Sequence, residues 1–291
     1  MNHVEIYLKT NGPTRSSSVA EYLQCSLGLS PEAARKRISR AGKQVRSISG
    51  MLPKKEAFLY LEEDQGTSRL HNAFLTALRE TGSVYGVAID GLQARKGCVS
   101  RNEFAVISGS ADRQKKSVPN DKIIRNLREH KIVWVEEVEG EEFLYLLDPE
   151  ESSSSIPRYQ AQQRVEAVML EALKDWLRNL GMVSYDKVAI RGREPDRSIG
   201  PFKFDLTAPS YLSPLIGFSS GKLKPGFVVA DVFSDIQLDE FQVRFFLKKI
   251  ASLKTYDKIG SVLPILFAPG FSREALRLCK EAGVMAATPT N

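Results

Sequence analysis

Gly226-Phe227-Val228-Val229-Ala230-Asp231-Val232-Phe233 is the stretch of sequence on which the fold of the C-terminal half depends. Its residues are apolar without interruption apart from one carboxylate, Asp231. A short apolar run that is rich in β-branched residues and bounded by turn formers is typical of a strand. Pro225 stands before this run and Ser234 after it, so we predict a strand from Gly226 to Phe233.

Helical and strand-like patterns alternate on both sides of this strand. An amphipathic helix comes first, with apolar residues at i, i+3, i+4 and i+7 spacing over four turns: Val165, Val168, Met169, Ala172, Leu173, Trp176, Leu177 and Leu180. The other predicted elements are strands at 183–190, 202–207, 262–268 and 284–287 and helices at 239–254 and 272–282. Two prolines between Thr207 and Pro214 are expected to take the chain out of the sheet there. The order predicts a mixed sheet covered by helices.

A second apolar strand, Phe202-Lys203-Phe204-Asp205-Leu206, also carries one aspartate. With these two strands, the order of elements over about residues 160–291 resembles the PD-(D/E)XK, or restriction-endonuclease-like, family. The resemblance implies that Asp205 and Asp231 hold one or two divalent ions such as Mg²⁺, and that Glu166 on the first helix assists them. Glu166, Asp205 and Asp231 are therefore the catalytic candidates of an active domain, with Asp205 and Asp231 as metal ligands.

The family's acidic-x-Lys motif is broken in this chain, because Phe233 stands where the lysine is expected. Another lysine could substitute for it, since geometry rather than sequence position decides a site. Nothing in the sequence distinguishes among the candidates Lys203, Lys224, Lys248 and Lys249. The broken motif favours a degenerate domain without cofactor over a Mg²⁺-dependent nuclease, so the interpretation leans away from an enzyme.

Residues 1–64 read as three helices followed by a two-stranded hairpin, which is the order of a winged-helix or helix-turn-helix module. Ser30-Pro31-Glu32 is typical of a helix start and opens a helix from Pro31 to Ala41. This helix has a small apolar face and a cationic outer face, as expected of a helix that enters the major groove. The candidate DNA-binding residues are Arg35, Lys36, Ser39, Arg40, Lys43, Lys54 and Lys55.

Residues 65–150 repeat this plan loosely, with helices near 69–80, 87–95, 100–107 and 120–130 and a hairpin at 133–147. The hairpin is acidic and would be repelled by phosphates, so this second winged-helix-like module is expected to pack, space or dimerise. A serine-rich linker at 151–160 separates it from the restriction-endonuclease-like domain at 161–291. The fold class is thus α+β or α/β, with two N-terminal modules and a mixed-sheet domain.

The charge, the apolar runs and the rare residue types of the chain indicate which classes of protein and site it can belong to. The net charge of +6 permits a polyanionic partner, and the excess of cations lies in residues 1–64 and 151–291. No apolar run reaches the roughly 20 residues of a membrane span, and no export signal opens the chain, so a cytoplasmic protein is expected. The three cysteines and three histidines are isolated, which disfavours disulfides and zinc. No phosphate-binding loop or nucleophile elbow occurs.

These observations predict a DNA-binding protein whose degenerate nuclease-like domain docks a partner or forms a homodimer. The outline is similar to abortive-infection antitoxins and other regulators of antiviral defence or transcription, where the second domain meets a protein of the same system. The alternative is a Mg²⁺-dependent DNA endonuclease of a defence or mobile-element system, which requires its three carboxylates to converge. A scaffold without DNA contact would require Lys36, Arg40 and Lys43 to be buried or ion-paired.

Overall fold

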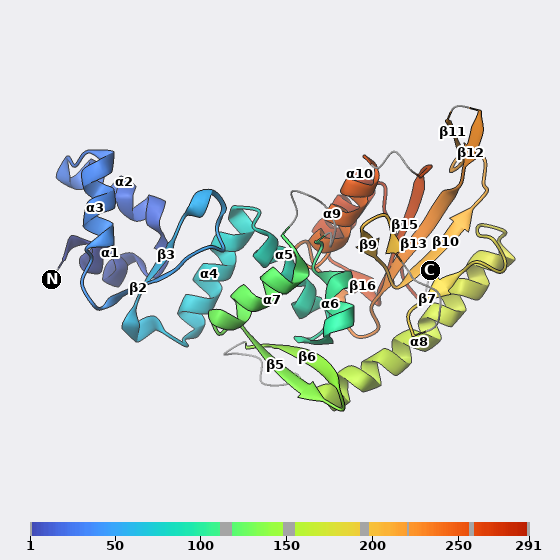
Figure 1. Cartoon of the computed structure of the whole chain (residues 1–291), viewed down its shortest axis with the longest axis horizontal. Helices are drawn as coiled ribbons and strands as arrows, with labels where there is room; N and C mark the ends of the chain where they lie inside the picture. Colours follow the sequence, from blue (N-terminus) through green and yellow to red (C-terminus); the bar gives the residue numbers. More distant parts are fainter. Residues whose placement is uncertain are drawn as a thin grey trace. The chain divides into compact units, whose positions relative to one another are not determined.

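The computed structural model describes residues 2–110, 118–147, 155–192, 198–219, 221–255 and 259–289 (Figure 1). The chain divides into two units, one of Met1–Gly86, Ile124–Val133 and Leu147–Ser152 and the other of Val87–Ile123, Trp134–Leu146 and Ser153–Asn291. Residues 65–150 contribute to both units, and residues 151–154 of the expected linker lie outside the described residues. The predicted boundaries at 64 and 150 therefore stay predictions.

The N-terminal unit begins with α1 (His3–Asn11), β1 (Thr14–Arg15), α2 (Ser16–Leu27), α3 (Pro31–Ser39), β2 (Val45–Ile48), β3 (Phe58–Leu61) and α4 (Ser68–Glu80). The three strands form an antiparallel sheet in the order β1-β3-β2. Ser30 caps α3 through the amide of Ala33, and Pro31 occupies its first turn, as the sequence predicts. The core of this unit includes side chains from α1, α2 and α3, among them Val4, Leu8, Val19, Leu23 and Ala34.

The next elements repeat this order. They are α5 (Val84–Ala94), β4 (Cys98–Ser100), α6 (Arg101–Ile107), α7 (Asn120–Glu129), β5 (Val133–Val138) and β6 (Glu141–Leu146). Their strands pair in the order β4-β6-β5, which matches β1-β3-β2 position for position. The predicted helices and hairpin strands are confirmed to within a few residues. Strands β1 and β4 were not predicted, because strands of two or three residues leave no periodicity to detect.

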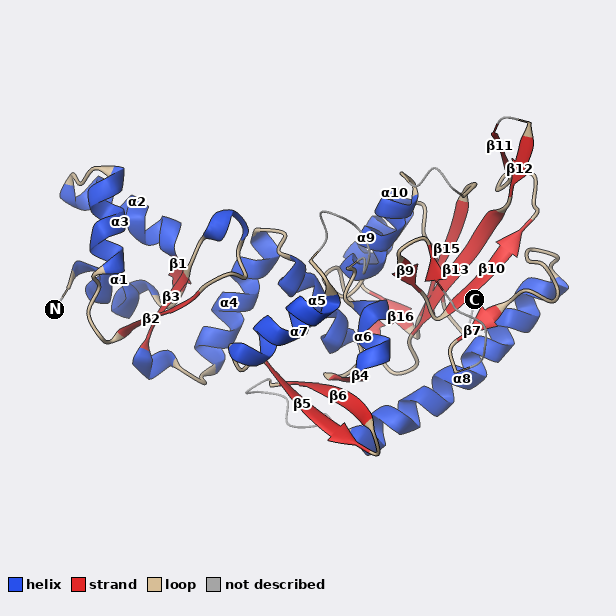
Figure 2. Ribbon diagram, in the orientation of Figure 1, coloured by secondary structure: helices blue, strands red, loops and turns tan. Residues whose placement is uncertain are grey.

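The C-terminal part is a five-stranded mixed sheet with helices on both faces (Figure 2). Its elements are α8 (Ile156–Asn179), β7 (Ala189–Ile190), β10 (Leu206–Ser210), β13 (Gly226–Val232), α9 (Arg244–Leu253), β15 (Val262–Phe267), α10 (Arg273–Ala282) and β17 (Met285–Ala287). The strand order is β17-β15-β13-β10-β7, antiparallel from β7 to β13 and parallel from β13 to β17. The predicted mixed sheet is confirmed. Three small pairs flank it: β8 (Ser198–Ile199) with β9 (Phe202–Lys203), β11 (Gly217–Ser219) with β12 (Lys222–Lys224), and β14 (Gln237–Leu238) with β16 (Gly270–Phe271).

Strand β13 lies at the centre of this sheet and organises its core. Val228, Ala230 and Val232 face the helix α8, where Leu170 and Leu173 pack against them. Each fully buried aliphatic side chain of this kind contributes about 1.5–3 kcal/mol. The opposite face of β13 carries Asp231, which points toward α9. The only carboxylate of the strand therefore lies in the interior of the domain.

Three details of the prediction are wrong. The strand expected at 202–207 is divided into β9 and β10, which belong to different sheets, and Asp205 lies between them. The strand expected at 183–190 is limited to Ala189–Ile190, and β10 does not leave the sheet at its first proline but continues through Pro209. β7 pairs only with Leu206 and Thr207, so Pro209 lies beyond the last β7 pair, where a missing N–H breaks no ladder bond on that side. The carbonyl of Pro209 accepts a hydrogen bond from the Ser184 amide at 2.9 Å.

The face that α8 buries also differs from the expected one. Five of the eight residues of the predicted apolar stripe are exposed: Val165, Val168, Ala172, Trp176 and Leu180. The buried stripe consists of Tyr159, Gln162, Glu166, Leu170, Leu173 and Leu177. Two stripes with helical spacing run along this helix, and the one that packs on the sheet is the one that carries polar residues. Among the described helices, none has both the length and the apolar composition that a membrane crossing requires.

Candidate functional site

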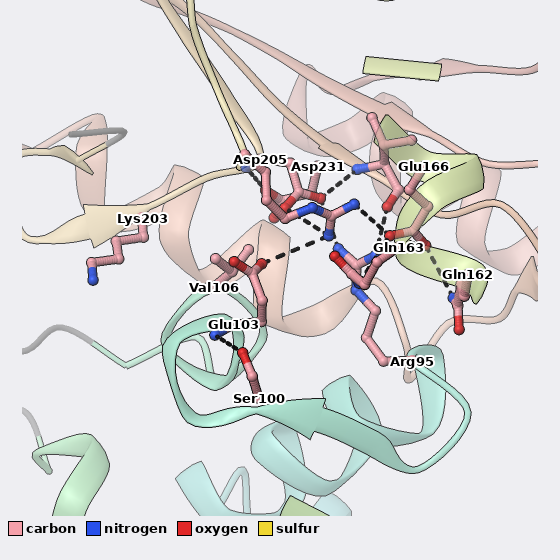
Figure 3. Close-up of polar contacts among 12 residues, drawn as sticks. Arg95, Ser100, Glu103, Val106, Gln162, Gln163, Glu166, Lys203, Asp205 and Asp231 are labelled. Atoms are coloured by element: carbon pink, nitrogen blue, oxygen red, sulfur yellow. Dashed lines mark hydrogen bonds and ion pairs between the residues drawn. The ribbon is translucent and has the colours of Figure 1, made fainter. Parts of the chain in front are cut away.

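Three carboxylates named from the sequence converge inside the C-terminal unit (Figure 3). Glu166 comes from α8, Asp205 directly precedes β10, and Asp231 lies in β13; all three are completely buried. The amide of Asp205 donates to Oδ1 of Asp231 at 2.9 Å, and Arg95 reaches both Glu166 and Asp205. The fold thus brings together residues that are widely separated in the sequence.

Arg95, at the end of α5, bridges two of these carboxylates. One Nη atom donates to Oε2 of Glu166 and to the carbonyl of Val232 at 2.9 Å, and the other donates to Oδ2 of Asp205 at 2.7 Å. The guanidinium also lies over the ring of Phe233, 4.3 Å from its centroid. Burial by itself would lower the pKa of Arg95, but the carboxylates of Glu166 and Asp205 outweigh it and the pKa is raised. Arg95 is therefore held charged.

Arg191 directly follows β7 and places a second guanidinium beside Glu166 and Asp205. Its Nη2 donates to Oε2 of Glu166 at 2.5 Å, and its Nη1 lies 3.3 Å from Oδ1 of Asp205 and 3.7 Å from Oε2 of Glu103. Its backbone amide donates to the carbonyl of Asp205 at 2.8 Å, so strand pairing fixes its position. Burial opposes the charge of Arg191, but Asp205 and the other carboxylates raise its pKa overall.

Lys249 on α9 pairs with the third carboxylate. Its Nζ donates to Oδ2 of Asp231 at 2.6 Å and to the carbonyls of Val106 and Lys203 at 2.8 and 2.9 Å, so all three ammonium protons have acceptors. The ammonium lies 4.2 Å from the ring centroid of Phe204. Burial raises the pKa of Asp231 to about 6, partly offset by Lys249, and burial lowers the pKa of Lys249. Both shifts express the cost of removing charges from water.

The cations thus nearly balance the carboxylates, and we call these residues the buried ion-pair cluster: Arg95, Glu103, Glu166, Arg191, Asp205, Asp231 and Lys249. Backbone amides add further donors, from Val232 to Asp205 Oδ2 at 2.9 Å and from Ser234 to Glu166 Oε1 at 3.3 Å. Such a network is stable only when every charge is paired and hydrogen-bonded. Its geometry is that of a closed structural core.

A divalent ion does not fit this arrangement. Mg²⁺ requires free carboxylate oxygens and room for several waters. Both oxygens of Glu166 and of Asp231 already accept hydrogen bonds, and those of Asp205 face Arg95, Val232 and Arg191. Within the described part of the chain, no group of histidine, cysteine, aspartate and glutamate side chains is arranged to hold a metal ion. The two guanidinium groups lie where the carboxylates would meet such an ion.

The sequence named Lys249 only as one of several substitute lysines and did not single out Arg95 or Arg191. Of the lysines considered, Lys249 reaches Asp231, whereas Lys203 contributes its backbone carbonyl to the cluster. A usable signal for Lys249 was its place on the apolar face of its helix, one turn after the buried Phe245. Arg95 ends an apolar helix and Arg191 ends an apolar strand, which are weaker signals of the same kind.

The cationic residues named for DNA contact lie on the surface of the N-terminal unit. All are exposed, and none forms an ion pair with a described residue: Arg35, Lys36, Ser39, Arg40, Lys43, Lys54 and Lys55. They line two sides of α3. Arg35, Ser39, Lys54 and Lys55 border a groove of about 970 Å³ beside the β2–β3 hairpin, and Lys36 and Arg40 border a second groove with Arg37, which the sequence analysis missed.

The tip of the β2–β3 hairpin holds two consecutive lysines in an unusual backbone conformation. Lys54 and Lys55 have φ of 55° and 59°, in the left-handed region that glycine and asparagine favour. A residue with a Cβ costs about 1 kcal/mol there, and strain of this kind is found preferentially at functional sites. The hairpin tip thus presents two ammonium groups at a cost to stability.

No family model matches the chain, and none of the curated proteins matches it. Among solved structures, the chain is similar to a repair endonuclease from Pyrococcus abyssi, at 17% identity over 50% of this chain and 51% of that one, with a TM-score of 0.30. It is also similar to EndoMS in apo form, at 18% identity over 54% and 63% of the two chains, with a TM-score of 0.24. The chain thus spans less than two thirds of either structure.

Proposed function

We propose that this chain binds double-stranded DNA through the cationic surface of its N-terminal unit, and that its C-terminal domain is a restriction-endonuclease-like fold without a working metal centre. The observation that carries the proposal is a set of exposed cations on α3, just after it and at the tip of the β2–β3 hairpin that have no ion-pair partner among the described residues: Arg35, Lys36, Arg37, Arg40, Lys43, Lys54 and Lys55. Exposed, uncompensated Lys and Arg side chains are the groups that neutralise phosphates and release counterions.

The topology of the N-terminal unit supports a winged-helix interpretation. Its elements follow the order helix, strand, helix, helix, strand, strand, and the three strands pair in the order first-third-second. In this arrangement α3 is the recognition helix and the β2–β3 hairpin is the wing. Repetition of the order from α5 to β6 supports a second module of the same kind.

The topology of the C-terminal domain supports the restriction-endonuclease-like interpretation. The helix α8 is followed by the antiparallel strands β7, β10 and β13, then by α9 and the parallel strand β15. Asp231 lies in β13 and Asp205 directly precedes the adjacent strand β10, close to where that fold carries its metal ligands. Regulation within a defence or mobile-element system, with a protein partner, is the role that this pairing of domains suggested, and it stays a prediction.

The buried ion-pair cluster favours binding over cleavage. A nuclease centre has to admit a scissile phosphate, a metal ion and water. Glu166, Asp205, Asp231 and Lys249 expose no surface, and Arg95 is almost as completely buried. The guanidinium groups of Arg95 and Arg191 supply the positive charge that a divalent ion would supply in an active centre. No cofactor is therefore proposed for this domain.

Fluorescence anisotropy with a labelled duplex in EDTA tests the DNA-binding proposal. The variant R35E/K36E/R40E reverses three exposed charges on α3, and we expect it to weaken binding by more than about 100-fold. The control R273E/K280E reverses two exposed charges on α10 and should change the affinity by less than about threefold. Equal effects of both variants, or no binding by the wild type, would refute the proposal.

A second candidate function, metal-dependent DNA cleavage, is favoured by the convergence of Glu166, Asp205 and Asp231 with Lys249 beside them. It requires the cluster to open, so that Arg95 and Arg191 leave the carboxylates. Incubation of supercoiled plasmid with Mg²⁺ or Mn²⁺ tests it directly. Nicking by the wild type that is lost in D205N, while DNA binding persists in both proteins, would establish the nuclease and replace our primary proposal.

A further inference from the structure

The outward face of α8 is apolar without a described partner. Four large side chains on this face are exposed: Val165 (53%), Val168 (70%), Trp176 (42%) and Leu180 (56%). Three alanines of the same helix are also exposed: Ala161, Ala167 and Ala172. Between positions 161 and 180 the exposed charged residues of this helix are Arg164 and Asp175. A surface helix of a monomeric domain normally carries charge on its outer face. An apolar stripe of this length therefore indicates a packing surface.

The spacing of this stripe is that of a helix that packs against another helix. Ala161, Val165, Val168 and Ala172 follow one another at intervals of four, three and four residues, and Trp176 and Leu180 continue the stripe. The intervals average about 3.8 residues, close to the 3.6 residues of a helical turn, so these side chains form a seam on one face that a second helix can cover. The small alanines permit an approach of about 8–10 Å between the helix axes.

The seam is also nearly symmetric about Leu170, which lies on the buried side of α8. Val168 and Ala172 are equally far from this position, and Val165 is about as far from it as Trp176. In an antiparallel pair with its twofold axis beside this turn, Val168 of one copy meets Ala172 of the other, and Val165 meets Trp176. A twofold interface requires this kind of self-complementary pattern.

The charges at the edge of the seam obey the same symmetry. Arg164 and Asp175 are 11 residues apart, close to three turns of about 3.6 residues, so they lie on the same flank of α8. Their midpoint falls within one residue of position 170. Across a twofold axis, Arg164 of one copy therefore faces Asp175 of the other, and the pair forms twice. Among the described residues, the cation that Asp175 contacts is Arg178, at a long distance of 3.9 Å.

We propose that α8 is a homodimerisation surface on which a second copy of this chain packs antiparallel, with Arg164–Asp175 pairs on one flank of the apolar seam. The apolar spacing, the symmetry about Leu170 and the charge complementarity select a second copy as the occupant. A single helix pair buries less than the roughly 800 Å² per partner of a standard interface, so we expect a dissociation constant of about 1–50 μM. The proposal does not depend on DNA binding.

Sedimentation velocity on the full chain tests this surface. The mass should rise from 32.4 kDa toward twice that value as the concentration increases. V168E places a charge in the seam at an exposed position and should weaken dimerisation by more than about 30-fold. The matched control A167E adds the same charge to the same helix, about 100° away from Val168, and should leave the dimer intact.

A charge-swap cycle identifies the antiparallel geometry. R164D places two aspartates opposite each other and D175R two arginines, so each should weaken the dimer by about tenfold, whereas R164D/D175R should restore it. A wild type that stays monomeric at about 200 μM, well above the expected constant, would overturn the proposal. So would equal effects of V168E and A167E, or a double swap no better than either single one.

Discussion

The two units of this chain use the same cationic residue types in opposite environments. On α3 and at the tip of the β2–β3 hairpin, arginines and lysines are exposed and have no ion-pair partner among the described residues, whereas Arg46 of β2 pairs with Glu62. In the C-terminal unit, Arg95, Arg191 and Lys249 are buried and each is held by one or more carboxylates. Exposed cations are free to meet an external anion, whereas buried ones have already been neutralised. A binding surface therefore differs from a structural core in whether its cations are exposed and unpaired, not in whether it contains cations.

The largest effect is expected where a buried pair is broken. K249M removes the ammonium that Asp231, Val106 and Lys203 share, so it leaves a buried carboxylate without its cation. We expect the free energy of unfolding to fall by about 3–5 kcal/mol in a urea titration. The exposed control K280M should change it by less than about 0.5 kcal/mol. A loss as small as that of the control would show that the cluster contributes no stability.

A double-mutant cycle tests whether Asp231 and Lys249 stabilise the fold as a pair. In D231N/K249M neither a buried carboxylate nor a buried ammonium remains, so the double variant should cost less than the sum of the single ones by about 1–3 kcal/mol. Additive losses would mean that Lys249 and Asp231 are not coupled, contrary to their 2.6 Å contact.

A pH dependence of the K249M variant follows from the raised pKa of Asp231. Burial raises this pKa to about 6 even with Lys249 present, and loss of the ammonium raises it further. A carboxyl group with a raised pKa in the folded state contributes stability at low pH that is lost as the pH rises through that pKa. The deficit of K249M relative to wild type should therefore shrink by about 1–2 kcal/mol between pH 7 and pH 5. A deficit that grows toward pH 5 would contradict this account.

Smaller effects are expected at the hairpin tip, where a substitution should raise folding stability and lower DNA affinity. K54N/K55G replaces two lysines in left-handed conformations by residues that favour them, so the free energy of unfolding should rise by about 1 kcal/mol. DNA affinity should fall, because two ammonium groups are removed from the surface. If affinity is unchanged, the tip does not contact DNA.

Much of the fold follows from local pattern. The strand β13 was predicted to within one residue, because an unbroken apolar run bounded by Pro225 and Ser234 has few other structures available. The face of α8 could not be predicted, because Val165–Val168–Ala172 and Glu166–Leu170–Leu173 both have helical spacing. The buried stripe contains Gln162, which donates to Glu166 on the same helix, and Glu166, whose other partners Arg95 and Ser234 are distant in the sequence and invisible to periodicity.

Only part of the buried ion-pair cluster could be predicted, because partners that are distant in the sequence leave no local pattern. Asp205 and Asp231 interrupt apolar runs of the sequence, which marks them as unusual. Arg95 lies 71 residues from Glu166 and 110 from Asp205, and nothing in its own neighbourhood indicates that it pairs with either. The exposed cations of α3 were predicted because exposure follows from the helical wheel and needs no distant partner.

The most direct test of the account is the salt dependence of DNA affinity in the variant K36A/R40A, compared with the control R273A/K280A. Each phosphate contact contributes a slope of about −0.9 to the logarithm of affinity against the logarithm of salt concentration. The account predicts that K36A/R40A makes this slope shallower by nearly 2, whereas the control leaves it unchanged. An unchanged slope in K36A/R40A, or a similar change in the control, would contradict the claim that the exposed cations of α3 bind DNA.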